Sequence, residues 1–272
     1  MKRLIVAFIT LMGRCNKIMH NKAYKCKIYP TNKQQVLINK TLGRVRYAWN
    51  QWVENFNKPK DKEKVFKTVK QLRSENEWMK EVSARAVQQK ERDFKEFKNQ
   101  FFNNKRKSKL GRPNFKSRKG KQVYKLPNQK FEIIDNKIYL EKIGFVKIVL
   151  DRQIPINVKF INVTISKDKV GDYFVSIRVE QNIEQKPKTG KTVGIDVGLK
   201  SFAVLSDGTY VDNPKYLNEN QVKIKRLQQH LSRSQKGSNR REKVRKKLAK
   251  EHRKVQRQRS YFLHNISSFI VN

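Results

Sequence analysis

Cysteine is almost missing from this sequence: among 272 residues only Cys15 and Cys26 occur, and they form no CxxC pair. This excludes a zinc ribbon within the chain and a disulfide framework, and it favours a reducing cytoplasm. A long apolar run is missing as well. The stretch Leu4–Met12 follows basic residues but is too short to span a membrane and lacks a small-residue cleavage site. We therefore expect a cytoplasmic protein without a membrane partner.

Acidic residues are scarce: 23 Asp and Glu stand against 64 Lys and Arg, giving a net charge of +41 and a pI near 10.4. A compact body with that charge repels itself unless a polyanion neutralises it. Nucleic acid is the natural partner, because binding releases condensed counterions. A membrane surface is less favoured because basic residues are spread through every segment. The 37% hydrophobic content excludes a fully disordered chain.

The first half of the sequence predicts a strand followed by helices. Residues 23–29 alternate, and Thr31–Gln34 forms a capping box that opens a helix running towards Phe56. Two further helical patterns cover residues 65–72 and 86–102. Trp49 and Trp52, like Phe94, Phe97 and Phe101, follow helical spacing. Such side chains could stack on nucleobases, but a packed core is the favoured interpretation.

A basic, glycine- and proline-containing segment at residues 105–121 predicts a loop that is either a solvated linker or a clamp on phosphates. Short strands are expected next, and a small antiparallel barrel that includes residues 23–29 would close them. Their predicted ranges are 123–126, 131–134, 137–140, 144–150, 160–166 and 173–180. A linker at residues 185–190 follows.

Residues 192–209, TVGIDVGLKSFAVLSDGT, predict a β-hairpin, with a third strand at residues 210–212. Asp196 lies within an apolar run that reads as a buried strand. A buried carboxylate is costly unless it is paired or bound to a metal. Asp196 is thus either a solvated or lysine-paired side chain, or the first ligand of a divalent metal in an RNase H-like nuclease fold.

Residues 217–263 are helical in composition, with a predicted break near 235–239. Between Gln221 and Arg259 there are 16 Lys and Arg but only 2 Glu, and the apolar stripe is thin. We expect this helical pair to gain stability by lying along a nucleic-acid duplex.

Together these motifs resemble the OrfB/TnpB family of insertion-sequence transposon proteins, which are RNA-guided DNA endonucleases related to the type V CRISPR effectors. The stretches that carry the resemblance are YKCKIYPT (24–31), GRPNFKSR (111–118), VTISKDKVGDYFVSI (163–177), residues 193–208 with NPKYL (213–217), and RSYFLHNIS (259–267). The resemblance covers about residues 20–272.

The resemblance implies an α+β multi-domain protein. Residues 1–18 would be an N-terminal extension or a start-site artefact, 19–30 and 108–185 a wedge β-barrel, 31–107 an inserted helical recognition lobe, and 190–272 a partial RuvC-type, RNase H-like α/β domain. It implies guide RNA and target DNA as partners, Mg²⁺ as cofactor and Asp196 as the first catalytic and metal-binding carboxylate. No pattern specifies an oligomeric state. The basic residues expected to contact nucleic acid are Arg112, Lys116, Arg118, Lys119, Lys225, Arg226, Arg240, Arg241, Arg245, Lys246, Arg253 and Lys254.

The sequence departs from the family pattern after Asn272, where the family continues with a catalytic Glu, a four-cysteine zinc segment and a final catalytic Asp. Two-metal chemistry needs several carboxylates. We therefore expect a truncated protein with a weak or incomplete Mg²⁺ site and no zinc, inactive as a nuclease on its own. The alternative is a nuclease-dead, RNA-guided DNA-binding regulator. We also expect an exposed apolar sheet edge and low stability of residues 190–272 without RNA.

Overall fold

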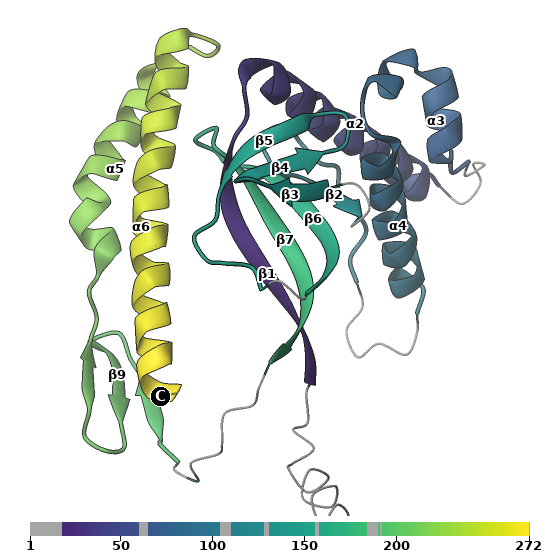
Figure 1. The fold of residues 1–272 in the computed structure, drawn as a ribbon. Coiled ribbons are helices and arrows are strands. Elements are labelled where there is room, and N and C mark those ends of the chain that lie inside the picture. Colours follow the sequence, from purple (N-terminus) through teal and green to yellow (C-terminus); the bar gives the residue numbers. More distant parts are fainter. Residues whose placement is uncertain are drawn as a thin grey trace, which may run out of the picture. The chain divides into compact units, whose positions relative to one another are not determined.

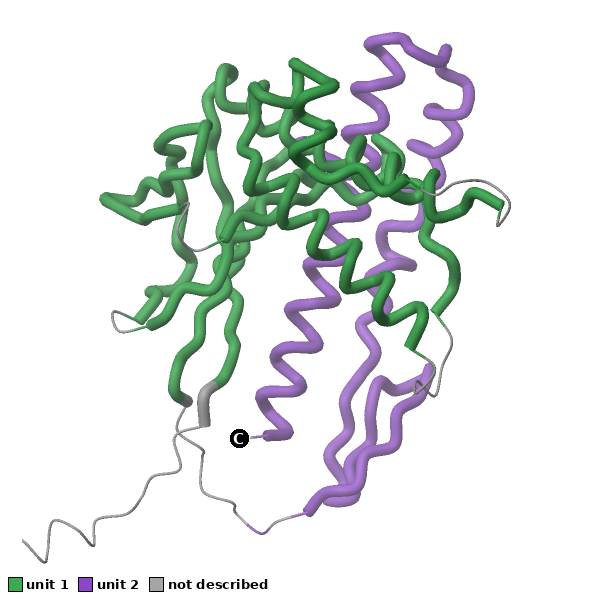
Figure 2. The backbone as a smooth tube through the Cα atoms, turned by 90° about the vertical axis from the view of Figure 1, so that its right-hand side faces the viewer, with its two compact units in different colours: residues 1–168, 172–185 green, residues 169–171, 186–272 purple. Residues whose placement is uncertain are grey.

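The computed structural model describes residues 18–59, 65–103, 110–127, 131–155, 158–183, 190 and 192–271. The predictions for residues 1–17, for Cys15, and for parts of the basic loop and of the 185–190 linker lie outside these ranges. The chain divides into two compact units, residues 1–168 with 172–185, and residues 169–171 with 186–272 (Figure 2). None of the described helices combines the length and apolar character that crossing a bilayer requires.

The first unit is built on a curled, seven-stranded antiparallel sheet in the order β2-β6-β7-β1-β5-β4-β3 (Figure 1). Every strand predicted from the sequence is present. The bounds are β1 Ile18–Tyr29, β2 Gln122–Pro127, β3 Phe131–Ile134, β4 Lys137–Leu140, β5 Gly144–Val149, β6 Lys159–Lys167 and β7 Tyr173–Ile183. The long strand β1 pairs with β7 on one side and β5 on the other, so the N-terminal strand lies at the centre of the sheet.

Among the described residues the sheet is an open half-barrel rather than the closed barrel we predicted, because β2 and β3 are its two edges. The β2 edge is covered by helices instead of a strand. Lys125 of β2 lies 3.6 Å from the carboxylate of Asp93, and Arg46 donates a hydrogen bond of 3.0 Å to Gln122. Covering an edge with helices removes the need for closure.

Helix α2 (Asn32–Asn57) begins where the capping box predicts. Thr31 accepts a hydrogen bond from the backbone of Gln34, and the Gln34 side chain accepts one from the backbone of Thr31. One face of α2, including Ile38, Val45 and Trp52, is buried in the cluster that the helices share with the sheet.

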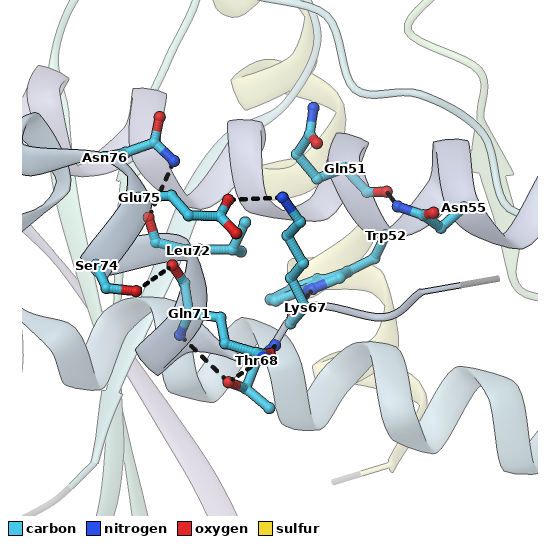
Figure 3. Close-up of polar contacts among 10 residues, drawn as sticks. All are labelled: Gln51, Trp52, Asn55, Lys67, Thr68, Gln71, Leu72, Ser74, Glu75 and Asn76. Atoms are coloured by element: carbon cyan, nitrogen blue, oxygen red, sulfur yellow. Dashed lines mark hydrogen bonds and ion pairs between the residues drawn. The ribbon is translucent and has the colours of Figure 1, made fainter. Parts of the chain in front are cut away.

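Two further helices, α3 (Val69–Glu75) and α4 (Ala84–Phe101), are joined by the short 3-10 helix η1 (Glu77–Glu81). A second capping box, Thr68 with Gln71, opens α3, and Lys67 forms an ion pair with Glu75 at 2.6 Å (Figure 3). The indole N–H of Trp52 donates to the carbonyl of Lys67 at 2.9 Å, which ties α3 to α2.

The helices and the sheet share one hydrophobic cluster. Trp52 and Phe94 are buried in it, and Trp49, Phe97 and Phe101 pack against it partly exposed. The core interpretation of these aromatic residues is confirmed. Since residues 31–107 and the sheet lie in one compact unit, their division into a recognition lobe and a wedge barrel stays a prediction.

The second unit contains a three-stranded antiparallel sheet in the order β10-β9-β8 and two helices. Its elements are β8 Ile195–Val197, β9 Ser201–Leu205, β10 Tyr210–Asp212, α5 Tyr216–Arg233 and α6 Asn239–Val271. The predicted hairpin, third strand and helix break are all present. Ala203, Leu205 and Val211 form a small buried cluster, and the C-terminal part of α6 packs on it (Figure 1).

Candidate nucleic-acid interface and the strand carboxylate

Asp196 lies in the middle of β8, at the edge of the three-stranded sheet. It is opposite Val204 of β9, which in turn is opposite Tyr210 of β10. Because side chains alternate along a strand, these three residues share one face, and the buried Ala203 and Val211 belong to the other. Asp196 therefore points away from the hydrophobic cluster.

The prediction that Asp196 lies in a buried strand is wrong, because all three residues of β8 are exposed. Ile195 and Val197 are 46% and 66% exposed. The sequence pattern predicts an apolar strand, but a strand is buried only when other segments cover it. Among the described residues, β8 pairs with a strand only on its β9 side. An exposed apolar sheet edge is the arrangement we expected, and it sits at β8. The exposure of Asp196 lends no geometric support to its role as a metal ligand.

The carboxylates of this sheet do not form a metal site. Asp207 lies in the turn after β9, where its side chain accepts a hydrogen bond from the backbone of Thr209, and this bond lowers the pKa of Asp207. Asp212 is on β10, two strands from Asp196. Within the described residues no group of three or more His, Cys, Asp or Glu side chains could hold a metal ion. These residues do not fit a two-Mg²⁺ centre, which needs several converging carboxylates.

A hollow of about 310 Å³ adjoins the turn between β8 and β9. Its walls are mainly apolar and come from the hairpin, from the segment before α5 and from the last third of α6. Residues lining it include Val197, Leu199, Phe202, Phe262, Leu263 and Arg259.

Helices α5 and α6 form an antiparallel pair that is held by few apolar contacts (Figure 1). Ile224, Val244 and Val255 are its buried apolar residues, and Lys223 of α5 forms an ion pair of 2.6 Å with Glu251 of α6. Most of the basic side chains along the pair are exposed. The thin apolar stripe predicted from the sequence is confirmed, and it leaves a broad cationic surface.

The predicted contact residues of this pair differ in their surroundings. Lys225, Arg226, Arg240 and Lys246 are exposed. Arg241 is half-buried and its guanidinium donates hydrogen bonds to the carbonyls of Leu231 and Ser234, at the end of α5. The other three also have structural neighbours.

Arg245 is paired with Glu242 at 2.5 Å, a contact that raises the pKa of Arg245 and lowers that of Glu242. Lys254 donates to Asn220 at 3.4 Å, and Arg253 is half-buried on α6. Arg241 and Lys254 thus link the two helices, which the sequence pattern did not distinguish from free surface charge.

The described part of the basic loop, residues 110–121, is docked on α2 rather than free. Asn50 donates to the carbonyl of Lys116 at 3.0 Å and accepts from its backbone N–H at 2.8 Å. The indole N–H of Trp49 donates to the carbonyl of Asn114 at 3.0 Å. The solvated-linker interpretation therefore does not hold for this part of the loop, where Arg112, Arg118 and Lys119 are exposed.

Lys116 occupies the most constrained position in the loop. Its Nζ lies 3.9 Å from the ring centroid of Trp49, and Lys90 of α4 approaches the same ring at 5.2 Å. Burial and the neighbouring charge of Lys90 lower the pKa of Lys116 to about 8. Two lysines, Lys116 and Lys90, thus lie close together beside Trp49 in the first unit.

Asp93 of α4 is the acidic residue that balances part of this charge. Burial raises its pKa, but the hydrogen bond from Lys90 and the charges of Lys90 and Lys125 outweigh burial and leave the pKa below its usual value. Lys90 and Lys125 were not predicted as site residues. No signal within either segment marks them, because they meet the loop only in the folded chain.

Comparisons with known proteins give a consistent result. Residues 174–272 match the family OrfB_IS605, described as "Probable transposase", and residues 19–57 match the family HTH_OrfB_IS605, described as "Helix-turn-helix domain". In this structure residues 19–57 contain most of β1 and the single long helix α2, not two helices joined by a turn. The docking geometry of a helix-turn-helix therefore does not apply to this segment.

Two relatives match over nearly the whole chain. A "Putative RNA-guided DNA endonuclease" of Streptomyces pristinaespiralis is 30% identical in an alignment of 261 residues that covers 92% of this chain and 64% of that protein. The "Putative RNA-guided DNA endonuclease InsQ" of Escherichia coli (strain K12) is 26% identical, covering 92% of this chain and 63% of that protein. The chain thus spans slightly less than two thirds of the length of either relative.

Proposed function

The chain belongs to the OrfB family of insertion-sequence transposon proteins, and from this membership we propose that it binds a guide RNA and the DNA strand paired to that RNA. In this mode base pairing reads the sequence, and the protein holds the backbone of the RNA–DNA duplex. Binding would take place in the cytoplasm.

The observation that supports the proposal is the α5–α6 pair. Its apolar stripe is too thin to account for a helical pair of this length, and its remaining surface is crowded with lysine and arginine. Like charges at this density repel one another, so the isolated pair is strained electrostatically. A phosphate backbone laid along the pair would neutralise that charge and release counterions.

We further propose that this chain does not cut DNA by itself. A metal-dependent nuclease reaction needs carboxylates that converge on the ions. The described strands of this sheet carry only Asp196 on β8 and Asp212 on β10, two strands apart. Because these two carboxylates do not converge, they do not form a two-metal cleavage centre.

A second function follows from the same two features. A protein with a large cationic binding surface and no converging carboxylate set in its described part would occupy a guided DNA site without cutting it. Such a protein would act as a regulator, for example by blocking a promoter.

The test is to crosslink RNA to the full chain in cells, sequence it, and prepare DNA duplexes that do or do not match the recovered RNA over about 20 base pairs. The chain loaded with this RNA should bind the matching duplex in preference to the scrambled one, and neither duplex should be cut in the presence of Mg²⁺.

Asp196→Asn is the matched control, because it removes the carboxylate and keeps the shape of the side chain. It should bind as the wild type does. Recovery of RNA no different from total cellular RNA would overturn guided binding. Mg²⁺-dependent cutting that disappears in Asp196→Asn would overturn the inactivity of the chain and establish Asp196 as a catalytic residue.

A further inference from the structure

The curled sheet of the first unit has one face turned to the core and one turned to solvent. Cys26 and Ile28 of β1 and Val146 and Ile148 of β5 are buried on the inner face. By alternation, the intervening residues of β1, β5 and β4 share the outer face. The burial pattern of β5 agrees, with exposed residues at every second position.

This outer face presents aromatic rings to solvent. Tyr29 of β1 is 48% exposed, Phe145 of β5 is 48% exposed, and Tyr139 of β4 is 38% exposed. Tyr139 and Phe145 are direct cross-strand partners with ring centroids 5.3 Å apart. A cross-strand aromatic pair stabilises a sheet by itself. Stabilising the sheet accounts for the pair of Tyr139 and Phe145. It does not account for the exposed ring of Tyr29 or for the lysines around the three rings.

Lysines lie between the rings. Lys147 of β5 is opposite Tyr29 on one side and Lys137 of β4 on the other. Lys25 lies over the ring of Phe174 in β7 at 5.1 Å. We name the set Tyr29, Tyr139, Phe145, Lys25, Lys137 and Lys147 the aromatic–lysine face.

The lysines of this face outnumber its carboxylates, although Glu132 of β3 is exposed directly opposite Tyr139. Within the described residues, Lys25, Lys137 and Lys147 form no ion pair with a carboxylate, whereas their neighbour Lys27 pairs with Asp172 at 3.2 Å. Lys137 and Lys147 stand directly opposite each other, and like charges in that arrangement destabilise a sheet. A bound polyanion would remove this cost, so charge complementarity selects an anionic partner.

We propose that the aromatic–lysine face binds an unpaired stretch of nucleic acid, with bases stacked on Tyr139, Phe145 and Tyr29 and phosphates near the three lysines. Every base has a face that can stack, so such a platform tolerates sequence variation. Paired bases are already stacked within their own helix and offer no free face, so the platform selects single strands over duplexes. The inference rests on the proposed function and names a surface for it in the first unit.

The test measures binding of the full chain to an oligouridine of roughly a dozen nucleotides with one 2-aminopurine, to the same length of DNA, and to a blunt RNA duplex. The double variant Tyr139→Leu/Phe145→Leu keeps apolar bulk on the sheet but removes both rings. We expect it to weaken single-strand binding by about five- to a hundredfold and to remove the quenching of 2-aminopurine fluorescence. Binding of the duplex and the salt dependence should be unchanged.

The double variant Lys137→Gln/Lys147→Gln tests the other half of the face. It should keep the quenching but reduce the slope of log affinity against log salt by about two. Its melting temperature should rise, because the like-charge pair is gone. Tyr210→Leu, which removes an exposed ring from β10 in the second unit, should change neither quenching nor affinity.

Wild-type quenching and affinity in the leucine variant would overturn the proposal, as would an equal loss of duplex binding. Melting curves distinguish a failed fold from a failed contact. If crosslinking recovers specific RNA but the leucine variant binds single strands normally, the platform fails while the proposed function stands. If no specific RNA is recovered, the proposed function fails whatever the platform binds.

Discussion

At the residue scale, Lys116 shows how a sequence motif acquires chemistry from its surroundings. The basic loop supplies the lysine, but its environment comes from Trp49 of α2 and Lys90 of α4. Both lie far from Lys116 in the sequence. The loop could therefore be predicted to bind phosphate, whereas the lowered pKa of one of its lysines could not.

The pKa of about 8 makes a pH-dependent contribution to binding. A phosphate beside Lys116 favours the charged amine, so the pKa is higher in the complex than in the free chain. The contribution of Lys116 is then fully present below about pH 8 and decreases as the pH rises through that value, by at most about tenfold per pH unit. Titrating RNA affinity from neutral to alkaline pH would measure it.

Two variants separate this effect from general changes with pH. Lys116→Arg should bind with little pH dependence in the same range, because a guanidinium stays charged. Lys119→Arg, at an exposed position in the same loop, should keep the pH dependence of the wild type. If Lys116→Arg and the wild type lose affinity in parallel, Lys116 does not contact phosphate.

At the scale of elements, the neighbouring residues Arg240 and Arg241 have different roles. Both were predicted to bind nucleic acid, but Arg241 donates to the carbonyls of Leu231 and Ser234 at the C-terminal end of α5, where the regular hydrogen bonds of the helix run out. We expect Arg241→Gln to destabilise the α5–α6 pair by about 1 kcal/mol and to speed hydrogen exchange at the end of α5.

Arg240→Gln is the matched control, because the same charge is removed from an exposed neighbour. It should leave exchange unchanged and lower the salt slope of RNA binding by about one. Equal exchange rates in the two variants would show that the contacts of Arg241 do not hold the pair together.

The edge strand β8 is a second element with a testable consequence. It presents Ile195 and Val197 along an edge without a described partner, an arrangement that invites pairing between molecules. High salt screens the repulsion that keeps such cationic chains apart. Val197→Lys should therefore reduce aggregation in high salt, as measured by light scattering.

Val222→Lys on α5 provides the comparison, since it adds the same charge at a similarly exposed apolar position away from any strand. If both variants reduce scattering equally, added charge rather than the strand edge is responsible.

The elements also show where sequence reasoning succeeds and where it stops. The Thr31–Gln34 capping box and the strand alternation of residues 122–183 are local patterns, and the structure has the helix and strands that they predict. The burial of β8 and the closure of the barrel depend on which segments become neighbours. The burial of the strand that carries Asp196 was predicted wrongly for that reason. An apolar run indicates a strand but not whether the strand is central or at an edge.

At the scale of the whole molecule, the two units differ in how much apolar surface they bury. The first has a cluster that joins its sheet to α2, α3 and α4, whereas the second buries Ala203, Leu205 and Val211 below α6 and a few side chains between α5 and α6. Local stability follows buried apolar contacts. We expect amides in residues 192–271 to exchange hydrogen faster than those in β1, β6 and β7 when RNA is absent.

Bound RNA should change this order. Neutralising the cationic surface of α5 and α6 removes repulsion that opposes their pairing, so exchange there should slow when the recovered guide RNA is added, while β1 and β7 change little. Hydrogen-exchange mass spectrometry with and without RNA measures both the slowing in α5 and α6 and the unchanged exchange in β1 and β7. Equal protection of the two units in the free chain would mean that the few apolar contacts of the second unit are enough to stabilise it. The second unit would then not depend on a bound polyanion to neutralise its charge.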